Sequence, residues 1–443
     1  MAQTGTGSVA QSEWTPSRVR RTATVTVGLL MGVYVIDYID RVMIAVALPF
    51  IGGDLGLSKT GQGWLITVFA LVYMVFQIPG GYLADRFGSR RLLLTSLLLW
   101  SVFTALSGLV WGFVALLVVR ALFGVGQALF PGASFKAIAE RTVPGSRATA
   151  TGLMLSSNFL GAGLGPLVVA PVLLLLGWRH TFWAVALAGV LIALLLVTLL
   201  PRALPPHLTA AEPTVEPAAG PGDEPSGAAA GPGPAAYSMR TVLRTGAVWK
   251  FAALFCATNM LSYGMITWIP SYLLEERGIS LLQTGVAAAI PFLVMSLCVF
   301  LGGWLFDRYF TQRARIFAIP VLIAAAVMLV LMLRAETTVE FTLYQTLAMG
   351  IAGLSFMCVL GMPIRALPTA VVASGMGVVN MGGQLAGVLA PVVMGFLVDR
   401  FSYTAAFGFL IFSTVAAALI AMFVPQRPAD FIMATEPGAK GAS

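Results

Sequence analysis

The chain of 443 residues is 58% hydrophobic and only 10% charged, with a mean hydropathy of +0.90. A soluble protein carries about 25% charged residues, so these few charges could not cover a water-facing surface of this size. The composition therefore excludes an ordinary soluble enzyme. The net charge of +8 could suit nucleic-acid binding, but the positions of the charges, given below, indicate membrane topology instead.

Twelve apolar segments, separated by short charged stretches, follow one another along the chain. Each has at least 18 residues, enough for a helix to cross roughly 30 Å of hydrocarbon with its backbone bonded internally. Strands of a membrane barrel would instead alternate over about ten residues. The sequence therefore predicts an all-α membrane protein with twelve transmembrane helices, at 24–50, 61–83, 92–110, 113–138, 148–173, 180–200, 247–274, 284–306, 316–333, 340–363, 368–397 and 404–424.

A stretch rich in Pro, Gly, Ala and acidic residues divides these segments into two groups of six. Its composition cannot bury enough apolar surface to fold, so we predict a flexible linker there. No small-residue cleavage site follows the first apolar run, which argues against a removable signal peptide. The predicted parts are a tail 1–23, a six-helix bundle 24–200, the linker 201–245, a second bundle 246–425 and a tail 426–443.

The lysines and arginines are distributed unevenly between the two sides of the predicted helices. If both termini face the cytoplasm, 19 of the 26 lie in cytoplasmic segments and 5 in outer segments, with Arg41 and Arg120 inside helices. Such an excess of basic residues marks the cytoplasmic side of a membrane protein. We therefore predict a multi-pass inner-membrane protein, with both termini cytoplasmic and no nucleic-acid partner.

The two halves resemble each other at a constant offset of 222 residues. Parallel repeats of this kind place a substrate site near the midplane of the membrane, where the halves meet and rock around it. The matching pairs are Gly56-Leu57-Ser58 with Gly278-Ile279-Ser280, Gly80-Gly81 with Gly302-Gly303, Asp85-Arg86 with Asp307-Arg308, and Asn158 with Asn380.

Two charged loops carry a family resemblance. The stretch Gly81-Tyr82-Leu83-Ala84-Asp85-Arg86-Phe87-Gly88-Ser89-Arg90-Arg91 resembles the signature loop between helices 2 and 3 of the major facilitator superfamily, and Gly303-Trp304-Leu305-Phe306-Asp307-Arg308 resembles its degenerate copy. The resemblance implies the two-bundle fold of that superfamily and a cytoplasmic latch. The small Gly81 would allow close helix approach, and Asp85 would meet a helix N-terminus or Arg86 in one gating state. The predicted gating residues are Gly81, Asp85, Arg86, Arg90, Asp307 and Arg308; alternatively, these charges only mark topology.

Two further stretches are similar to one branch of this superfamily, the anion:cation symporters. They are Tyr38-Ile39-Asp40-Arg41, followed by Pro49, and Arg120-Ala121-Leu122-Phe123-Gly124-Val125-Gly126-Gln127-Ala128. The branch includes carriers of sugar acids, phthalate and sialic acid and the vesicular glutamate transporters. The resemblance implies movement of organic carboxylates coupled to protons or sodium. The branch commonly has an acid seven residues after the helix-4 arginine, whereas this chain has Gln127, which cannot titrate.

Four charged residues fall within predicted spans, where charges are costly and usually functional: Asp37, Asp40, Arg41 and Arg120. Asp37, Asp40 and Arg41 share one helical face. We predict that Arg41 and Arg120 bind a substrate carboxylate through their guanidinium forks. Asp40 or Asp37 would compete for an arginine when ionised, and its protonation would couple protons to the solute. The alternative is a purely structural buried ion pair.

Other polar residues within spans are candidates for the substrate site: Tyr38, Tyr73, Gln127, Asn158, Asn259, Tyr263, Asn380 and Gln384. The commoner use of such polar groups is to join neighbouring helices. The three cysteines, Cys256, Cys298 and Cys358, have a spacing that suits neither a disulfide framework nor a zinc site. We therefore expect no metal and no cofactor.

The leading hypothesis is a monomeric secondary transporter that imports a small organic anion, such as a sugar acid or an aromatic acid, with protons or sodium. A proton-driven exporter of a metabolite or drug is the alternative. Helix 5 favours it weakly, because Gly161-Ala162-Gly163-Leu164-Gly165-Pro166 partly resembles the antiporter motif of drug exporters. An enzyme is disfavoured because the sequence has neither a Walker-type loop nor an HExxH motif. A channel is disfavoured by the repeat and the latch loop.

Overall fold

The structure is a computed structural model that describes residues 14–143, 146–209, 239–310, 313–367 and 372–425. The described residues form helices, turns and loops, and no strand. The N half comprises α2 (Pro16–Leu55), α3 (Lys59–Phe87), α4 (Ser89–Ser107), α5 (Phe113–Arg141) and α6 (Arg147–Leu199). The C half comprises α9 (Gly246–Glu275), α10 (Leu281–Leu305), α11 (Ala314–Leu333), α12 (Thr338–Ala366), α13 (Val372–Arg400) and α14 (Tyr403–Ala421). Two short helices, α7 (Pro206–Thr209) and α8 (Met239–Arg244), and a π-helical turn, η3 (Phe306–Phe310), complete the chain.

Twelve membrane spans are accounted for by these helices. Ten helices of the described chain are long and apolar enough to cross a membrane. One of them, α6, contains two spans, because the chain reverses direction at Gly177, whose φ of 73° leaves the helical region. The remaining span is α2, whose 40 residues exceed the length that a bilayer requires. The prediction of an all-α membrane protein with twelve helices in two bundles is confirmed.

The first helix starts earlier than the hydropathy pattern indicated. α2 begins at Pro16, eight residues before the predicted start at residue 24. Proline suits the first turn of a helix because its missing N–H would have no partner there, and the Thr15 hydroxyl accepts a hydrogen bond from the Arg18 amide at 3.3 Å. The polar first turns of α2 therefore extend beyond its apolar segment. Residues 1–13, 210–238 and 426–443, which cover most of the predicted tails and linker, lie outside the described residues.

The internal repeat is reproduced in the geometry of corresponding turns. Gly56 and Gly278 both adopt left-handed backbone conformations, with φ of 60° and 62°. Two residues later, the hydroxyls of Ser58 and Ser280 cap the N-termini of α3 and α10. Residues 222 positions apart thus perform the same local task, as expected for two copies of one structural unit.

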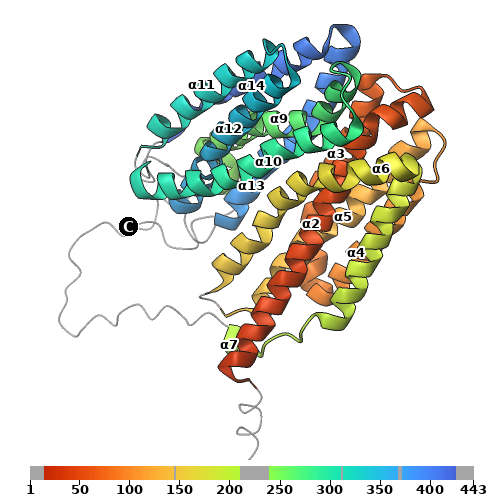
Figure 1. Cartoon of the computed structure of the whole chain (residues 1–443). Helices are drawn as coiled ribbons and strands as arrows, with labels where there is room; N and C mark the ends of the chain where they lie inside the picture. Colours follow the sequence, from red (N-terminus) through yellow and green to blue (C-terminus); the bar gives the residue numbers. More distant parts are fainter. Residues whose placement is uncertain (1–13, 144–145, 210–238, 311–312, 368–371, 426–443) are drawn as a thin grey trace, which may run out of the picture.

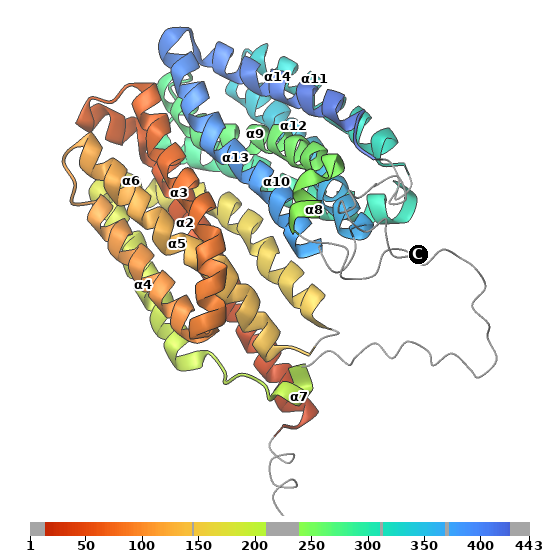
Figure 2. The same ribbon diagram turned by 180° about the vertical axis from the view of Figure 1, so that it is seen from behind.

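The two halves meet at one end and diverge toward the other. We call the end where α6 finishes and α9 starts the linker end, and the opposite end, with the α2–α3 and α9–α10 turns, the far end. Figures 1 and 2 show the bundles separating from the far end toward the linker end. In the described part of the chain, the hydrogen bonds and ion pairs between the halves start from Lys59, Thr60 and Thr67, near the far end of α3. This conformation is therefore closed at the far end.

Glycine allows the backbones of the two halves to touch at the far end. A Cβ atom added at Gly63 of α3 would lie 2.5 Å from the carbonyl oxygen of Pro391 in α13. On the other side of the interface, a Cβ at Gly285 of α10 would lie 2.8 Å from the carbonyl oxygen of Pro166 in α6. Such distances leave no room for a side chain, so the closed far end depends on these glycines.

Replacing Gly63 by alanine is expected to destabilise this closed form. The added methyl group must displace backbone atoms, and overpacking of this kind costs about 1–3 kcal/mol. We expect a lower unfolding temperature for the Gly63→Ala protein in detergent. Gly53→Ala is the matched control, because a Cβ there meets nothing within 4 Å. Equal unfolding temperatures for the two variants would show that the α3–α13 contact does not limit stability.

Candidate functional site

Arg41 lies near the middle of α2, surrounded by aromatic rings. Its guanidinium carbon is 4.4 Å from the ring centroid of Tyr73, 5.1 Å from that of Tyr38 and 5.4 Å from that of Phe69. Cation–π contacts of this kind stabilise a guanidinium by about 0.5–2 kcal/mol each. The side chain of Arg41 remains 15% exposed, whereas that of Asp37 is 1% exposed. The rings thus hold the Arg41 guanidinium in place without sealing it from solvent.

Two acceptors share the Nε atom of Arg41. Nε donates a hydrogen bond to Oε1 of Gln127 in α5 at 3.0 Å and lies 3.1 Å from Oδ2 of Asp37, one turn earlier in α2. Nη1 and Nη2 form the edge of a guanidinium that a carboxylate binds through two parallel hydrogen bonds. Arg41 therefore combines a fixed positive charge with a donor edge that suits an organic anion.

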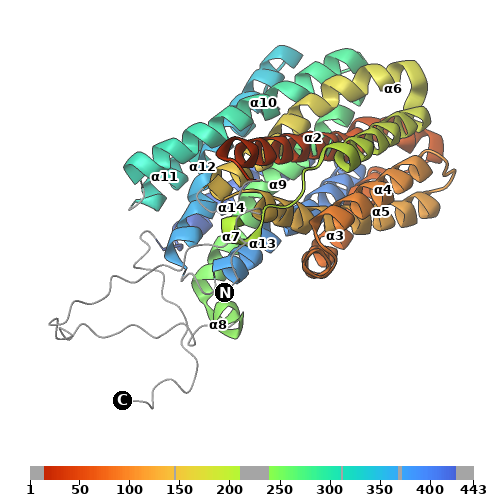
Figure 3. The same ribbon diagram turned by 90° about the horizontal axis from the view of Figure 1, so that it is seen from below.

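The C half contributes a tyrosine and a glutamine to the same region. The Tyr263 hydroxyl in α9 donates a hydrogen bond to Oε1 of Gln384 in α13 at 3.1 Å. Tyr263 also interacts electrostatically with Arg41 and Tyr73 of the N half. Helices α2 and α9 are in contact, and Figure 3 shows α2 lying between α6 and α9. The structure thus brings together six predicted residues from both halves, which we call the anion cluster: Tyr38, Arg41, Tyr73, Gln127, Tyr263 and Gln384.

Arg120 occupies a different environment, inside the N half. Its side chain is 1% exposed, its guanidinium carbon lies 4.4 Å from the Phe123 ring centroid, and Nε and Nη1 have no hydrogen-bond partner. Asp40 supplies the opposite charge that acts on Arg120, and Oδ2 of Asp40 accepts a hydrogen bond from the Thr104 hydroxyl at 2.6 Å. The two predicted substrate arginines therefore have different carboxylate partners: Asp37 for Arg41, and Asp40 for Arg120.

The three predicted asparagines lie in α6, α9 and α13 and differ in their contacts. Nδ2 of Asn259 donates to the carbonyl oxygen of Phe255 in its own helix at 2.9 Å. Oδ1 of Asn158 is buried without a hydrogen-bond partner, and Asn380, its repeat mate, is exposed. Asn158 has an unused acceptor, whereas the Asn259 amide is partly engaged within its own helix. Their roles in binding stay predictions.

The signature loop makes its observed contacts inside its own half. Asp85, whose side chain is 81% exposed, pairs with Nζ of Lys136 at 3.5 Å, and Nη2 of Arg90 donates to the carbonyl oxygen of Val197 at 2.6 Å. Arg86 is exposed, with its guanidinium carbon 5.5 Å from the ring centroid of the adjacent Phe87. These contacts hold α3, α4 and α5 together and reach α6. They do not join the halves, which agrees with a linker end that is open in this conformation.

Glycines bring α3 and α5 together beside this loop. A Cβ at Gly80 would lie 2.6 Å from the carbonyl oxygen of Ala128, and one at Gly132 would lie 2.8 Å from Cα of Gly81. A Cβ at Gly81 itself would meet nothing within 4 Å. The steric need for glycine predicted at Gly81 therefore falls on Gly80 and Gly132.

The second copy of the loop lies where α10 continues into the π-helical turn η3. Arg308 is exposed, and its Nε donates to the hydroxyl of the adjacent Tyr309 at 3.3 Å. The side chain of Asp307 lies outside the described residues. The gating role predicted for Asp307 and Arg308 stays a prediction.

A group of polar residues at the far end was not predicted from the sequence. We call it the far-end clasp: Lys59, Thr60, Glu275, Asp399 and Tyr403. Oδ1 of Asp399 accepts from the Lys59 amide at 2.8 Å, and Oδ2 accepts from the Thr60 amide at 2.7 Å and its hydroxyl at 2.6 Å. Glu275 receives hydrogen bonds from Nζ of Lys59 and from the Tyr403 hydroxyl. The clasp joins the N-terminus of α3 to α9, α13 and α14.

Comparison with known families and proteins supports a transporter. The family model described as Major Facilitator Superfamily matches residues 30–390. A probable galactarate/D-glucarate transporter of Escherichia coli (strain K12) is 28% identical over 415 residues, covering 88% of this chain and 91% of the relative. The hexuronate transporter of Bacillus subtilis (strain 168) is 26% identical over 414 residues, covering 89% and 94%.

Solved structures with low sequence identity share the fold. A bacterial homologue of the human lysosomal transporter Spinster, in an inward-facing and occupied conformation, superposes with a TM-score of 0.72 at 19% identity, covering 93% of this chain and 98% of that chain. A D-xylose–proton symporter superposes with a TM-score of 0.70 at 16% identity, covering 91% and 98%. These similarities extend over both halves, so the arrangement of the two bundles matches that of solved transporters.

Proposed function

Because this chain belongs to the Major Facilitator Superfamily, we propose that it is a secondary active transporter that moves a small organic anion of the sugar-acid class across the membrane by alternating access. The observation that carries the proposal is Arg41, a partly exposed guanidinium held by aromatic rings where helices of both halves meet. Relatives named as transporters of galactarate, D-glucarate and hexuronate support the substrate class.

The anion cluster has the chemistry to hold both ends of such a substrate. Arg41 supplies the positive charge for a carboxylate. Tyr263 and Gln384 supply hydrogen-bonding groups from the C half, which suit the hydroxyls of a polyhydroxy acid. A substrate bound between them would contact both bundles, so its binding would draw the halves together at the linker end.

We place the linker end in the cytoplasm of the cell, with the protein in the inner membrane as a monomer. The excess of basic residues at this end supports that orientation. The closed far end then faces outward, and the structure corresponds to an inward-open state. In this state, the anion cluster exchanges substrate with the cytoplasm.

Coupling to protons follows from the carboxylates beside the arginines. A carboxylate that loses its charge on protonation stops competing with the substrate for a guanidinium, so proton and anion binding favour each other. Asp37 and Asp40 of α2 are the two candidates. A protein of this fold could also run outward as a proton-driven exporter.

Uptake by reconstituted vesicles tests the proposed function. Proteoliposomes should accumulate labelled D-glucarate or D-galactonate when the pH is lower outside than inside, and accumulation should collapse when a protonophore is added. Replacing protons by a sodium gradient tests the other coupling ion. Failure to move any sugar acid or aromatic acid, together with extrusion of cationic drugs against a proton gradient, would overturn the anion proposal in favour of the exporter.

A further inference from the structure

We propose that Asp37 is the proton carrier that competes with the substrate for Arg41, and that Asp40 is a positioning residue whose partners are Arg120 and Thr104. This assignment rests on the proposed function, because it names the coupling residue of the same site. It follows from the pairing of charges in the N half, where each carboxylate of α2 lies with a different arginine.

Asp37 is the carboxylate that acts directly on the substrate arginine. Its Oδ2 lies 3.1 Å from Nε of Arg41, yet neither oxygen of Asp37 accepts a hydrogen bond in the described structure. The Nε–H instead points to Gln127. A buried carboxylate with an ion-pair partner but no hydrogen bonds is held almost entirely by charge attraction. Drawing the Arg41 charge toward a substrate anion removes that support and favours protonation of Asp37.

The charged and titratable groups around Asp37 come from several helices. On α2 itself they are Tyr34, Tyr38, Asp40 and Arg41. Tyr73 of α3 and Tyr263 of α9 act on the same Arg41–Tyr38 pair. Helix α5 contributes the neutral Gln127 and, on the Asp40 side, Arg120. Helix α6 carries titratable residues only near its first residue and at its central turn: Arg147, Arg179 and His180. Arg41 is thus the group that sets the charge of Asp37.

Asp40 lies in a closed environment that does not include the substrate arginine's donors. Its side chain is 0% exposed, and one oxygen is bound by the Thr104 hydroxyl. The Arg120 charge balances it, and Arg120 is itself 1% exposed. A proton or a substrate carboxylate reaching this pair would have to cross the packed interior between α2, α4 and α5. Such a pair fixes the orientation of α2, and through it the position of Arg41.

Gln127 explains why the task falls to Asp37 in this chain. The glutamine amide occupies the place beside Arg41 where a carboxylate would neutralise it, and an amide stays neutral at every pH. Asp37 approaches the same Nε atom from one turn earlier in α2. The chain thus keeps one titratable acid on Arg41, supplied by α2.

The transport step balances with one proton per carboxylate. A proton passes from water to the Asp37 carboxylate when an anion binds Arg41, and it returns to water on the other side after the anion leaves. No bond of the substrate changes. By linkage, the affinity for a monoanion rises by up to about tenfold for each unit that the pH falls, over the range in which Asp37 titrates.

The test compares substrate binding across pH in the wild type and two variants, with D-galactonate as the probe. Wild-type affinity should rise as the pH falls from 8 to 5. Asp37→Asn should bind with an affinity that varies less than about twofold over this range, and should still exchange labelled for unlabelled D-galactonate without accumulating it. Asp40→Asn should keep the wild-type pH slope, even where its affinity is lower.

The outcomes separate the assignment from the proposed function. A wild-type pH slope in Asp37→Asn, or a flat profile in Asp40→Asn, would overturn the assignment. A wild-type protein that binds D-galactonate and D-glucarate at no pH would overturn the proposed function itself. Because Asp40→Asn leaves Arg120 without its counter-charge, it could fail to fold, so the double variant Asp40→Asn/Arg120→Gln provides the same comparison without an unpaired buried charge.

Discussion

Replacing Arg41 by lysine is expected to lower sugar-acid affinity and uptake by about a hundredfold or more, although the positive charge is kept. A lysine ammonium has no planar fork to bind a carboxylate through two parallel hydrogen bonds, and it does not stack on rings as a guanidinium does. At this position the guanidinium carbon lies within 5.4 Å of three aromatic centroids and Nε binds Gln127. Isothermal titration calorimetry with D-glucarate and uptake by proteoliposomes would measure the loss.

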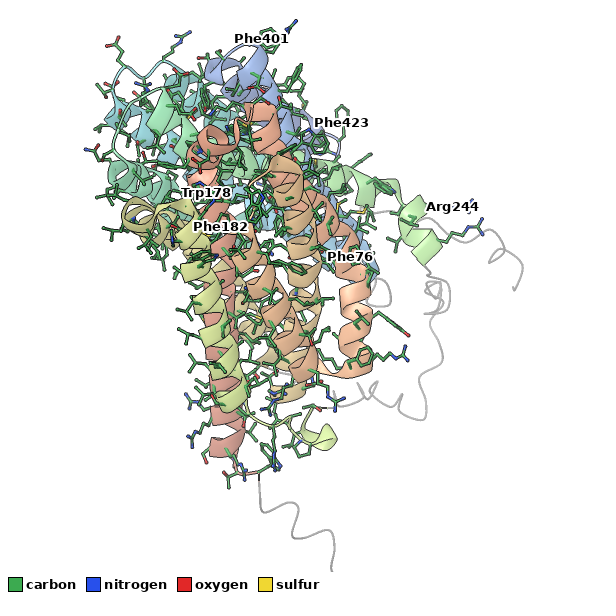
Figure 4. All side chains as sticks on the ribbon, turned by 90° about the vertical axis from the view of Figure 1, so that its right-hand side faces the viewer. Phe76, Trp178, Phe182, Arg244, Phe401 and Phe423 are labelled. Carbon is green, nitrogen blue, oxygen red and sulfur yellow. The ribbon has the colours of Figure 1, made fainter. Side chains whose placement is uncertain are left out.

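Arg244→Lys serves as the control for this substitution. Arg244 belongs to the short helix α8, and Figure 4 shows its side chain extending away from the bundles. The same change of chemistry there should leave affinity and uptake at the wild-type level. Affinity of Arg41→Lys within threefold of the wild type would show that Arg41 does not anchor the carboxylate, and the anion proposal would lose its main support.

The fold was predictable because its signals are local in sequence. Apolar segment lengths, the excess of basic residues on one side and the repeat at 222 residues each depend on short stretches of chain. The Gly56–Ser58 and Gly278–Ser280 turns confirm the repeat in structure, since glycine takes the left-handed position and serine caps the next helix in both copies. The helix start at Pro16 was missed because capping extends a helix into polar sequence that hydropathy excludes.

The candidate site was predictable in its residues but not in its pairings. A charge inside an apolar segment is visible in any sequence, so Asp37, Asp40, Arg41 and Arg120 stood out. Which acid lies with which arginine depends on the rotation of α2 against α4 and α5, and no local pattern reports that rotation. Thr104, which binds Asp40, carries no signal in the sequence because threonines are common in helices that pack together.

The far-end clasp illustrates the limit more clearly. Asp399 and Thr60 are separated by 339 positions, and Lys59 contributes only one basic residue to the topology pattern. A carboxylate at the end of one helix has a use only when the start of another helix lies beside it. The clasp therefore becomes visible only when the two halves are placed together, and it suggests which contact must break for the far end to open.

Replacing Asp399 by asparagine is expected to open the far end in a larger fraction of molecules. The Asp399 carboxylate accepts three hydrogen bonds at the N-terminus of α3, where the exposed N–H groups favour a negative charge. Asparagine removes that charge and turns an NH₂ group toward N–H or O–H donors. Hydrogen bonds to charged groups contribute about 1.5–3 kcal/mol each, and the loss of one shifts a two-state equilibrium by roughly ten- to a hundredfold.

Distances between spin labels at Trp111 and Glu336 would report this opening, because both residues lie at the far end on different halves and are exposed. The labels would be attached to cysteines introduced there, in a protein whose three free cysteines have been replaced. Asp54→Asn is the matched control, because Asp54 binds Arg179 and Trp178 within the N half. If Asp399→Asn gives the same distance distribution as Asp54→Asn, the clasp does not hold the far end closed. A longer distance in Asp399→Asn alone would identify the clasp as a gate, because only a contact between the halves can change their separation when it is lost.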